Sequence, residues 1–333
     1  MKKSLMIGAA LFTVGIQTVV AQVTTSAVPF LLISPNSRSS GMGEGGVGLA
    51  DDVWAQFWNP AGFAFQQGSE VAISHANWLP GFGLSDLWIA HSVFKSYIQD
   101  LDGTVSGGIT YLNLGEFIQT ASTGPEEIGR FKGFEFAFTA GYGTKVLDDL
   151  GFGVNARFIY SRLAPIGTAQ EKGRGVASGF SFDLGLLYKP QSVVIPFTDV
   201  DLRNALSIGA NLSNVGPNLT YIDKAQADPL PMNFRLGFAY HIFRDDFNNL
   251  MGTIDFSKLL VRRNSKGKAD PFLKALTYSW IDKSFSEELR EIVTSIGFEY
   301  WYGFPKLIAL RIGYFYEDPQ HGNRKFMTYG AGL

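Results

Sequence analysis

Apolar and polar residues alternate with a period of two along most of this chain. In the clearest run, 133–143, Phe134, Phe136 and Phe138 point to one face while Glu135 and Thr139 point to the other. Alternation of this kind is typical of β-strands with one apolar face. We therefore predict an all-β fold with strands at 69–77, 84–94, 104–113, 133–143, 150–161, 178–188, 206–213, 232–242, 249–258, 292–302, 306–316 and 325–333.

Two architectures could shield the apolar face of these strands. A soluble sandwich would bury it in a core, whereas a transmembrane barrel would turn it to lipid and keep small and charged residues in a wet lumen. The strands are about ten residues long, which a tilted strand needs to cross a bilayer. Tyrosines also recur near strand ends, as in an interfacial girdle: Tyr142, Tyr160, Tyr188, Tyr240, Tyr300 and Tyr314. The pattern favours a transmembrane antiparallel β-barrel over residues 69–333.

Short and long connections nearly alternate between the predicted strands. Long extracellular loops are expected at 114–131, 162–177, 214–231 and 259–291, and short periplasmic turns at 144–149, 243–248 and 303–305. The connections 189–205 and 78–83 depart from this alternation. In the longest loop, Ser284 and Ser286 can cap a short helix over Ser286–Glu291. The chain stops inside a strand at Leu333, and we expect truncation rather than closure by twelve strands, because an unpaired edge cannot face lipid.

The N-terminus has the pattern of a secretory signal peptide over residues 1–21. Lys2 and Lys3 precede the apolar stretch 5–20, and Val19-Val20-Ala21 forms a cleavage pattern that places the mature start at Gln22. A membrane anchor helix is the alternative, but it needs about 20 apolar residues and this run is shorter.

Residues 22–68 contain a glycine-rich run that ends in a strong turn. The run includes Gly41 and Gly43, and the turn is Asn59-Pro60-Ala61-Gly62. We interpret this stretch as a plug that lies inside the barrel or closes it. The alternative is a surface turn leading into the first strand.

Composition excludes several classes of function. The chain has 333 residues, a net charge of -2, 17% charged residues and 38 glycines, and it shows no basic face dense enough for nucleic acid. The absence of cysteine excludes disulfides, a thiolate zinc site and lipoprotein acylation. Four scattered histidines have no metal-ligand spacing, and no nucleophile motif or P-loop occurs. We therefore predict no catalytic, cofactor or metal site.

Charged residues fall into three groups. Asp51-Asp52 and Glu126-Glu127 are interpreted as solvated loop charge. The inward-facing set is interpreted as structural pairs between neighbouring strands: Glu135, Arg157, Asp183, Arg235, Asp255, Glu299 and Arg311. A basic cluster could meet lipopolysaccharide phosphates, which we favour at headgroup level, or a partner's acidic surface, or water: Lys258, Arg262, Arg263, Lys266 and Lys268.

Apolar residues at extracellular tips are candidates for contact with a partner. The 78–83 turn carries Trp78, Leu79 and Phe82, and the 162–177 loop carries Leu163 and Ile166. Exposed apolar tips often mark contact sites. A turn lying in the outer aromatic girdle is an equal alternative for the first tip.

Several motifs spread along the mature chain resemble one family. They are Ala27-Val28-Pro29-Phe30-Leu31, Ser37-Arg38-Ser39-Ser40-Gly41-Met42-Gly43, Trp58-Asn59-Pro60-Ala61, Asn211-Leu212-Ser213-Asn214-Val215-Gly216 with Thr220-Tyr221, Asn233-Phe234-Arg235-Leu236-Gly237, Asp255-Phe256-Ser257-Lys258-Leu259-Leu260-Val261 and Gly322-Asn323-Arg324-Lys325-Phe326. In combination they resemble the PorV family, the outer-membrane shuttle proteins of the type IX secretion system, within the FadL-like barrel group. Family members have about fourteen strands, an even number as in other bacterial barrels, so the last two strands are missing here.

The resemblance implies an integral outer-membrane protein of a Gram-negative cell. It implies docking at the giant translocon barrel, binding of the C-terminal signal domains of secreted cargo, and hand-over to a sortase-like attachment complex. The outer loops, including 162–177 and 259–291, would form the partner surface, in contact with outer-membrane lipid and lipopolysaccharide. The alternative is a FadL-type transporter of hydrophobic small molecules. An enzyme acting on lipopolysaccharide acyl chains is a third reading, and it lacks a nucleophile or metal site in this sequence.

Overall fold

Twelve strands of this chain form one antiparallel sheet, joined in sequence order from β1 to β12. A computed structural model describes residues 26–79, 86–121, 123–164, 174–191, 205–223, 226–264 and 267–333. The strands are β1 (Ser69–Asn77), β2 (Trp88–Ile98), β3 (Gly103–Thr120), β4 (Glu127–Leu147), β5 (Leu150–Ala164), β6 (Gly175–Tyr188), β7 (Leu206–Val215), β8 (Asn233–Arg244), β9 (Asn248–Leu259), β10 (Val293–Tyr302), β11 (Ile308–Tyr316) and β12 (Lys325–Gly332). The prediction of twelve antiparallel strands is confirmed. The predicted signal peptide, 1–21, lies outside the described residues.

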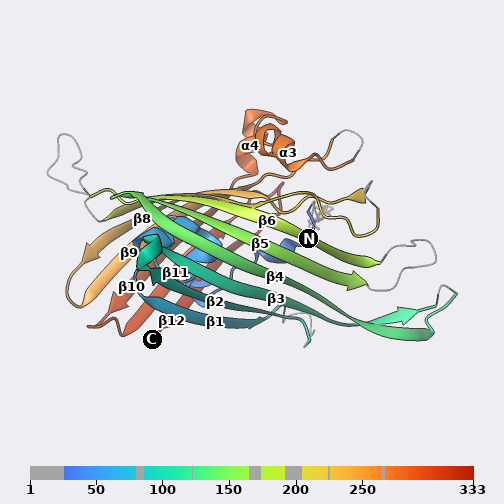
Figure 1. Cartoon of the computed structure of the whole chain (residues 1–333), viewed down its shortest axis with the longest axis horizontal. Coiled ribbons are helices and arrows are strands. Elements are labelled where there is room, and N and C mark those ends of the chain that lie inside the picture. Colours follow the sequence, from blue (N-terminus) through green and yellow to red (C-terminus); the bar gives the residue numbers. More distant parts are fainter. Residues whose placement is uncertain are drawn as a thin grey trace, which may run out of the picture.

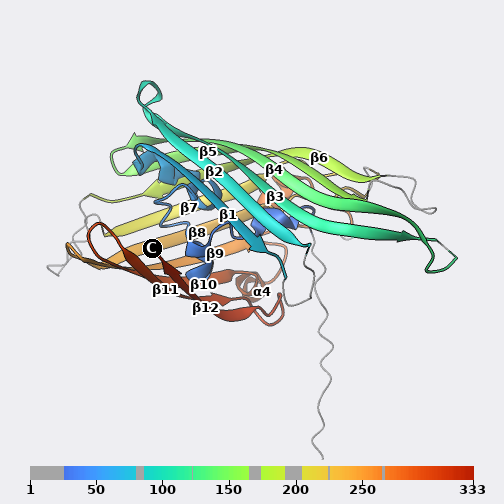
Figure 2. The ribbon, with the colours of Figure 1, turned by 90° about the horizontal axis from the view of Figure 1, so that it is seen from below.

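The sheet curves around the N-terminal part of the chain (Figures 1 and 2). β1 and β12 are the first and last strands of the order, and within the described ranges no backbone pairing joins them. A search of the described residues found no helix that is long and apolar enough to cross a membrane.

The two faces of the sheet differ as the period-two pattern predicts. In β6, Phe180 and Phe182 are 60% and 55% exposed, whereas Ser181 and Asp183 are 0% and 1% exposed. The apolar residues therefore point outward and the polar residues point inward. A soluble sandwich would bury its apolar face instead, so this outward display is the arrangement of a lipid-facing sheet.

Aromatic side chains stack across neighbouring strands on the outward face. Trp88, Tyr111, Phe134 and Tyr160 come from β2, β3, β4 and β5, and successive ring centroids lie 5.3, 5.8 and 5.9 Å apart. Cross-strand aromatic pairs of this kind stabilise a sheet and fix its register.

The expected loop 114–131 is wrong, because most of it is strand. β3 continues to Thr120 and β4 begins at Glu127, so their hairpin extends beyond the neighbouring strands (Figure 1). A register shift lies between Asn113 and Gly115, and it interrupts the period of two from which the strand end was predicted. The predicted loop 162–177 is also longer than the connection in the structure, since β5 reaches Ala164 and β6 begins at Gly175.

Residues 26–66, which we call the inner segment, fill the space on the inward face of the sheet. The segment contains four short helices: η1 (Pro29–Leu32), α1 (Ser37–Gly41), α2 (Ala55–Trp58) and η2 (Pro60–Phe65). Its side chains are buried together with strand residues, for example Phe30 with Ile89 and Ile159. The small and polar inward residues that suggested a wet lumen therefore contact this segment over part of the inward face.

Two helices interrupt the connection between β9 and β10. They are α3 (Phe272–Tyr278) and α4 (Phe285–Arg290), and the predicted short helix at 286–291 is confirmed. Ser284 and Glu287 form a capping box at the start of α4. The hydrogen bonds from the Ser284 side chain and backbone hold the pKa of Glu287 below its ordinary value. A further short helix, η4 (Gln99–Leu101), joins β2 to β3 at the opposite end of the strands.

Glycines on the inward face of the sheet allow the inner segment to approach the strands closely, and substitution by alanine tests this packing. A Cβ at Gly313 would lie 2.1 Å from the Gly43 nitrogen, whereas a Cβ at the outward Gly252 would lie 3.1 Å from a Phe298 ring carbon. We expect Gly313→Ala to lower the melting temperature of the folded protein in detergent, because a backbone must shift, and we expect Gly252→Ala to leave it nearly unchanged. Circular dichroism during heating measures both, and equal melting temperatures for the two variants would contradict the close packing.

Candidate functional site

The predicted plug residues meet the inward face of the sheet at backbone contact distance. Gly43 has φ +68°, and a Cβ there would lie 2.7 Å from the Tyr314 nitrogen in β11. Pro60 approaches β5 so closely that a Cβ at Gly153 would lie 2.2 Å from its carbonyl carbon. These approaches require glycine on one side of each contact.

Asn59 holds the turn of the inner segment together. Its side chain is fully buried, and its Nδ2 donates hydrogen bonds to the Val47 carbonyl (3.2 Å) and the Leu186 carbonyl in β6 (2.9 Å). Its Oδ1 accepts a hydrogen bond from the Ala61 nitrogen at 3.1 Å. Asn59 therefore links two parts of the inner segment to one strand. Gly62 is required beside it, because a Cβ there would lie 2.1 Å from the Ala50 carbonyl oxygen.

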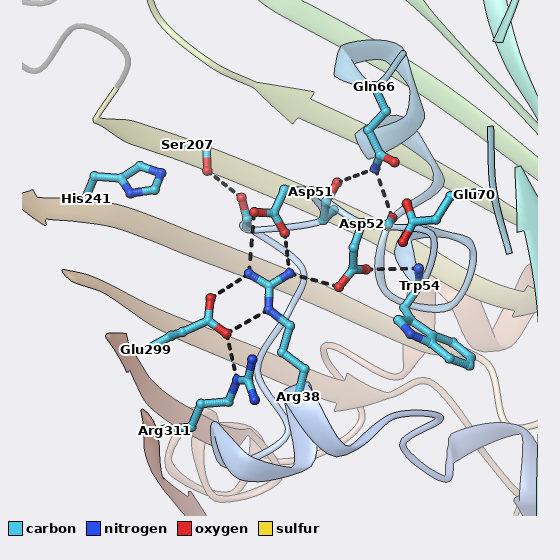
Figure 3. Close-up of polar contacts among 12 residues, drawn as sticks. Arg38, Asp51, Asp52, Trp54, Gln66, Glu70, Ser207, His241, Glu299 and Arg311 are labelled. Atoms are coloured by element: carbon cyan, nitrogen blue, oxygen red, sulfur yellow. Dashed lines mark hydrogen bonds and ion pairs between the residues drawn. The ribbon is translucent and has the colours of Figure 1, made fainter. Parts of the chain in front are cut away.

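Arg38, in the first turn of α1, binds three carboxylates: Asp51 and Asp52 of the inner segment, and Glu299 of β10, which connects the segment to the sheet (Figure 3). Its Nη1 lies 2.6 Å from Asp51 Oδ1 and 2.8 Å from Asp52 Oδ2. Its Nε and Nη2 form a fork on Glu299, at 2.9 and 2.7 Å. A bidentate pair of this kind has a defined geometry as well as a charge attraction.

The same glutamate is shared with a second arginine. Arg311 Nε of β11 donates to Glu299 Oε2 at 2.7 Å, and Glu299 is fully buried. Two guanidinium groups and three carboxylates therefore form one network at the boundary between the segment and the sheet. We call Arg38, Asp51, Asp52, Glu299 and Arg311 the arginine network.

The two aspartates of the network respond differently to burial. Burial acts to raise the pKa of both, but the charge and hydrogen bonds of Arg38 outweigh it for Asp51, whose pKa lies below its ordinary value. Burial prevails for Asp52, whose pKa is raised. Of the two aspartates, Asp52 therefore has the higher pKa and takes up a proton at a higher pH than Asp51.

Two further inward charges contact the inner segment. Asp255 Oδ2 accepts hydrogen bonds from the Gly46 and Val47 nitrogens, at 2.6 and 2.8 Å. The Arg235 guanidinium lies over the rings of Phe57 and Trp58, 5.2 and 5.1 Å from their centroids. These charges therefore bind the segment as well as lining the sheet.

The interpretation of the inward charges was right for some residues and incomplete for others. Neighbouring strands pair as expected in Arg157–Asp183 and Arg311–Glu299. The interpretation of Asp51-Asp52 as solvated loop charge is incomplete: both carboxylates bind Arg38, although Asp51 is exposed and Asp52 is partly exposed. Sequence reasoning gave Arg38 no role of its own. The signal that could have found it is a single arginine beside an acidic pair, within a segment expected to enter a barrel.

The residues predicted to contact a partner, near the outer ends of the strands, differ in their exposure. Trp78 packs against the buried cluster that contains Phe30, so it is only partly available to a partner. Leu79 and Leu163 are 45% and 40% exposed. Phe82 and Ile166 lie outside the described residues.

The predicted basic cluster is largely neutralised within the chain. Lys258 is 2% exposed and its Nζ forms ion pairs with Glu288 (2.6 Å) and Glu291. Arg262 pairs with Asp270 and Asp282, and Arg263 with Asp228. Lys268 is exposed, and Lys266 lies outside the described residues. The structure therefore differs from the expectation most clearly at Lys258, whose ammonium group is covered by protein.

Within the described residues, no group of three or more His, Cys, Asp or Glu side chains is arranged so that it could hold a metal ion. The contacts described above are packing contacts, hydrogen bonds and ion pairs, and they hold residues 26–66 against the inward face of a curved sheet.

An outward apolar face, an inward polar face and twelve antiparallel strands place this protein in the class of membrane β-barrels. A family model described as "Type IX secretion system protein PorV" matches residues 17–266. The chain belongs to the PorV family.

Solved structures of other barrels are similar to this chain at low identity. The toluene transporter TodX of Pseudomonas putida has 14% identity and a TM-score of 0.47, with 90% of this chain and 89% of that chain covered. A FadL homologue of Pseudomonas aeruginosa has 12% identity and a TM-score of 0.45, with 90% of this chain and 86% of that chain covered. No curated protein matches this chain.

The arginine network predicts how firmly the inner segment is held. Arg38→Met would leave three carboxylates around an uncharged side chain, and breaking a buried ion pair in this way costs about 3–5 kcal/mol. We expect proteinase K, which does not need Lys or Arg at its cleavage site, to cut within residues 26–66 much faster in this variant than in the parent protein. Trypsin is not suitable, because Arg38 is the only lysine or arginine of the segment. Arg130→Met is the matched control, because Arg130 pairs with Glu116 and Glu127 while 51% exposed, and surface pairs contribute about 0–1 kcal/mol. Equal cleavage rates in the two variants would show that the network does not hold the segment.

The carboxylates that cover Lys258 predict a response to acid. Burial acts to raise the pKa of Glu291, but the hydrogen bonds and charges of Lys258 and Lys283 outweigh it, and the pKa is lowered. The stabilisation is therefore present above the ordinary glutamate pKa of about 4.3 and is lost as the pH falls through the lowered value. We expect hydrogen exchange in α3 and α4 to be constant from neutral pH to about pH 5 after correction for intrinsic rates, and to rise below that.

His321 also faces Glu291, with its Nε2 3.9 Å from Oε1. Glu291→Gln is the control, since it should raise exchange at neutral pH and remove most of the acid response. An acid response that persists unchanged in Glu291→Gln would assign it to another group.

Proposed function

We propose that this chain is a non-enzymatic outer-membrane component of the type IX secretion system that receives secreted proteins and passes them on. In this proposal it docks at the giant translocon barrel, binds the C-terminal signal domains of the cargo, and hands the cargo to a sortase-like attachment complex. The observation that carries the proposal is membership of the PorV family across residues 17–266. The outward apolar face supports an integral position in the outer membrane.

The division of the chain follows from this proposal. Residues 1–21 are a signal peptide cleaved near Ala21, residues 22–68 are a plug, and residues 69–333 are the barrel. The buried contacts of Asn59 and Arg38 support a plug that is firmly seated rather than loosely inserted.

Docking is proposed at the end of the sheet opposite the short turns. Leu79 and Leu163 are exposed apolar residues there, and the β3–β4 hairpin adds Ile118 and Ile128, 56% and 60% exposed. Apolar side chains presented by protruding elements are suited to contact another protein. Contact with lipopolysaccharide phosphates is proposed only for exposed basic side chains of this end, such as Lys268.

A FadL-type transporter of hydrophobic small molecules is less well supported. Between the inner segment and β2, β3 and β5 there is a cavity of about 30 Å³, lined by Phe30, Trp54, His91 and Arg157 among others. That is room for about one or two water molecules. A transporter would require the inner segment to leave its buried contacts.

Substitution of the exposed apolar tips tests the docking proposal. We expect Leu79→Asp with Leu163→Asp to leave the sheet folded, because both side chains are exposed, and to reduce secretion of cargo at least tenfold in cells. Phe304→Asp is the matched control, since Phe304 is 77% exposed in the short turn between β10 and β11. Cargo in the culture medium and on the cell surface is measured by immunoblot. Normal secretion by the double variant would place the docking surface elsewhere.

A further inference from the structure

The α3–α4 hairpin, residues 271–291, packs on the outward face of the sheet. Ala275 and Leu276 of α3 lie in one apolar cluster with Leu212 of β7 and Phe234 of β8. Trp280, which follows α3, meets Phe234 edge to face, with ring centroids 5.6 Å apart. Phe234 alternates with the buried inward residues Asn233 and Arg235, so the hairpin covers the side of β7 and β8 that faces lipid elsewhere.

Lys258 of β9 explains why this part of the sheet is covered. It pairs in register with Phe234, so it lies on the outward face, yet it is only 2% exposed. Glu288 and Glu291 neutralise its charge, and its ammonium group lies 5.7 Å from the Trp280 ring centroid. A lysine on the lipid face of a strand is unfavourable, and α4 shields this one with carboxylates.

The helix α3 turns the apolar Ala275 and Leu276 to the sheet, but α4 also leaves large apolar side chains outward. On α4 the charged Glu288 is 8% exposed and faces the sheet, while Phe285 and Leu289, four residues apart, are 78% and 51% exposed beside the exposed Glu287 and Arg290. Leu273 and Ile281 are 66% and 72% exposed. An amphipathic helix in water buries its apolar side and exposes its charges, so the apolar side of this hairpin needs a different surrounding.

The position of the hairpin along the strands indicates what surrounds its exposed apolar side chains. β9 has 12 residues, and a strand of that length tilted by about 40° rises about 30 Å, the thickness of the hydrocarbon core. The hairpin lies within the connection between β9, which ends at Leu259, and β10, which begins at Val293: α3 starts at Phe272 and α4 ends at Arg290. Figure 1 shows α3 and α4 projecting from the sheet in this connection. It is therefore level with the interface between hydrocarbon and headgroups, where tyrosine and tryptophan such as Tyr278 and Trp280 are favoured.

We propose that the α3–α4 hairpin is an interfacial anchor whose apolar face, formed by Leu273, Ile281, Phe285 and Leu289, inserts into the outer leaflet of the membrane. The occupant of this surface is lipid, because the surface continues the outward apolar face of β7 and β8. Lys274 and Lys283, 47% and 39% exposed in their side chains, lie beside this face and are paired with Asp270 and Glu291. The anchor therefore depends on its apolar side chains rather than on free positive charge. The inference rests on the outer-membrane part of the proposed function and is independent of cargo binding.

The chain contains no cysteine, so single cysteines can be labelled without background. We would attach an environment-sensitive fluorophore to Phe285→Cys in the full chain, reconstituted in phosphatidylcholine vesicles with or without lipid carrying a spin label near the headgroup. Phe180→Cys, on the outward face of β6 and 60% exposed, is the control for contact with lipid. Ile128→Cys, near the tip of the β3–β4 hairpin and 60% exposed, is the control for contact with water. Ile281→Cys repeats the test if Phe285→Cys fails to fold.

The expected result is that spin-labelled lipid quenches the Phe285 probe at least twofold, as it does the Phe180 probe, while aqueous iodide quenches only the Ile128 probe. Quenching of the Phe285 probe by iodide, with Phe180 still quenched by lipid, would overturn the anchor and leave the membrane-spanning sheet intact. If that iodide quenching disappeared in native outer membranes, the surface would belong to a partner protein, which also overturns the lipid assignment. Iodide quenching of both Phe285 and Phe180 would contradict the outer-membrane proposal itself.

Discussion

A half-buried arginine that joins the inner segment to the buried Glu299 of the sheet is the interaction on which the rest of this structure depends. Arg38 reaches Asp51, Asp52 and Glu299 at once, and Arg311 completes the charge balance at Glu299. Removing an arginine and its carboxylates from water is costly, and the cost is offset only when every charge is paired with good geometry. The network therefore permits one placement of the segment along the strands. In that placement the backbone of Gly43 touches β11, and the backbone of Pro60 touches β5 at Gly153. Each contact needs glycine, because a Cβ there would overlap the facing backbone.

The alternation of outward apolar and inward polar residues could be predicted from the sequence, because it depends only on neighbouring positions within each strand. Each strand repeats an apolar residue every second position, and this is enough to predict twelve strands and the face that each residue occupies. The strand ends were less readable, since the bulge near Gly115 changes the phase of the alternation within β3. A periodic pattern carries no information on where a strand ends beyond such a bulge.

The candidate site was only partly predictable, because it depends on contacts between distant residues. The turn Asn59-Pro60-Ala61-Gly62 was visible from its composition, but its strand partner Leu186 was not. Arg38 and Glu299 are 261 positions apart, and no spacing rule connects them. Lys258 was assigned to lipid phosphate on its position at the end of a strand. The side chains of Glu288 and Glu291 bind it instead, because a folded hairpin brings them back over β9.

Together these features describe a membrane β-barrel protein of the PorV family whose inner segment is bound to the inward face of the sheet by ion pairs and close backbone contacts. In the proposed function, the outward apolar face lies in the membrane and the exposed apolar tips contact partners. The central claim is that this chain acts within the type IX secretion system. Purification from native membranes in mild detergent, with mass spectrometry of the proteins and lipids that accompany it, tests that claim most directly. The account predicts a very large outer-membrane barrel, or secreted proteins that share one C-terminal domain. A barrel that carries only lipid or fatty acid would contradict the account and favour a transporter.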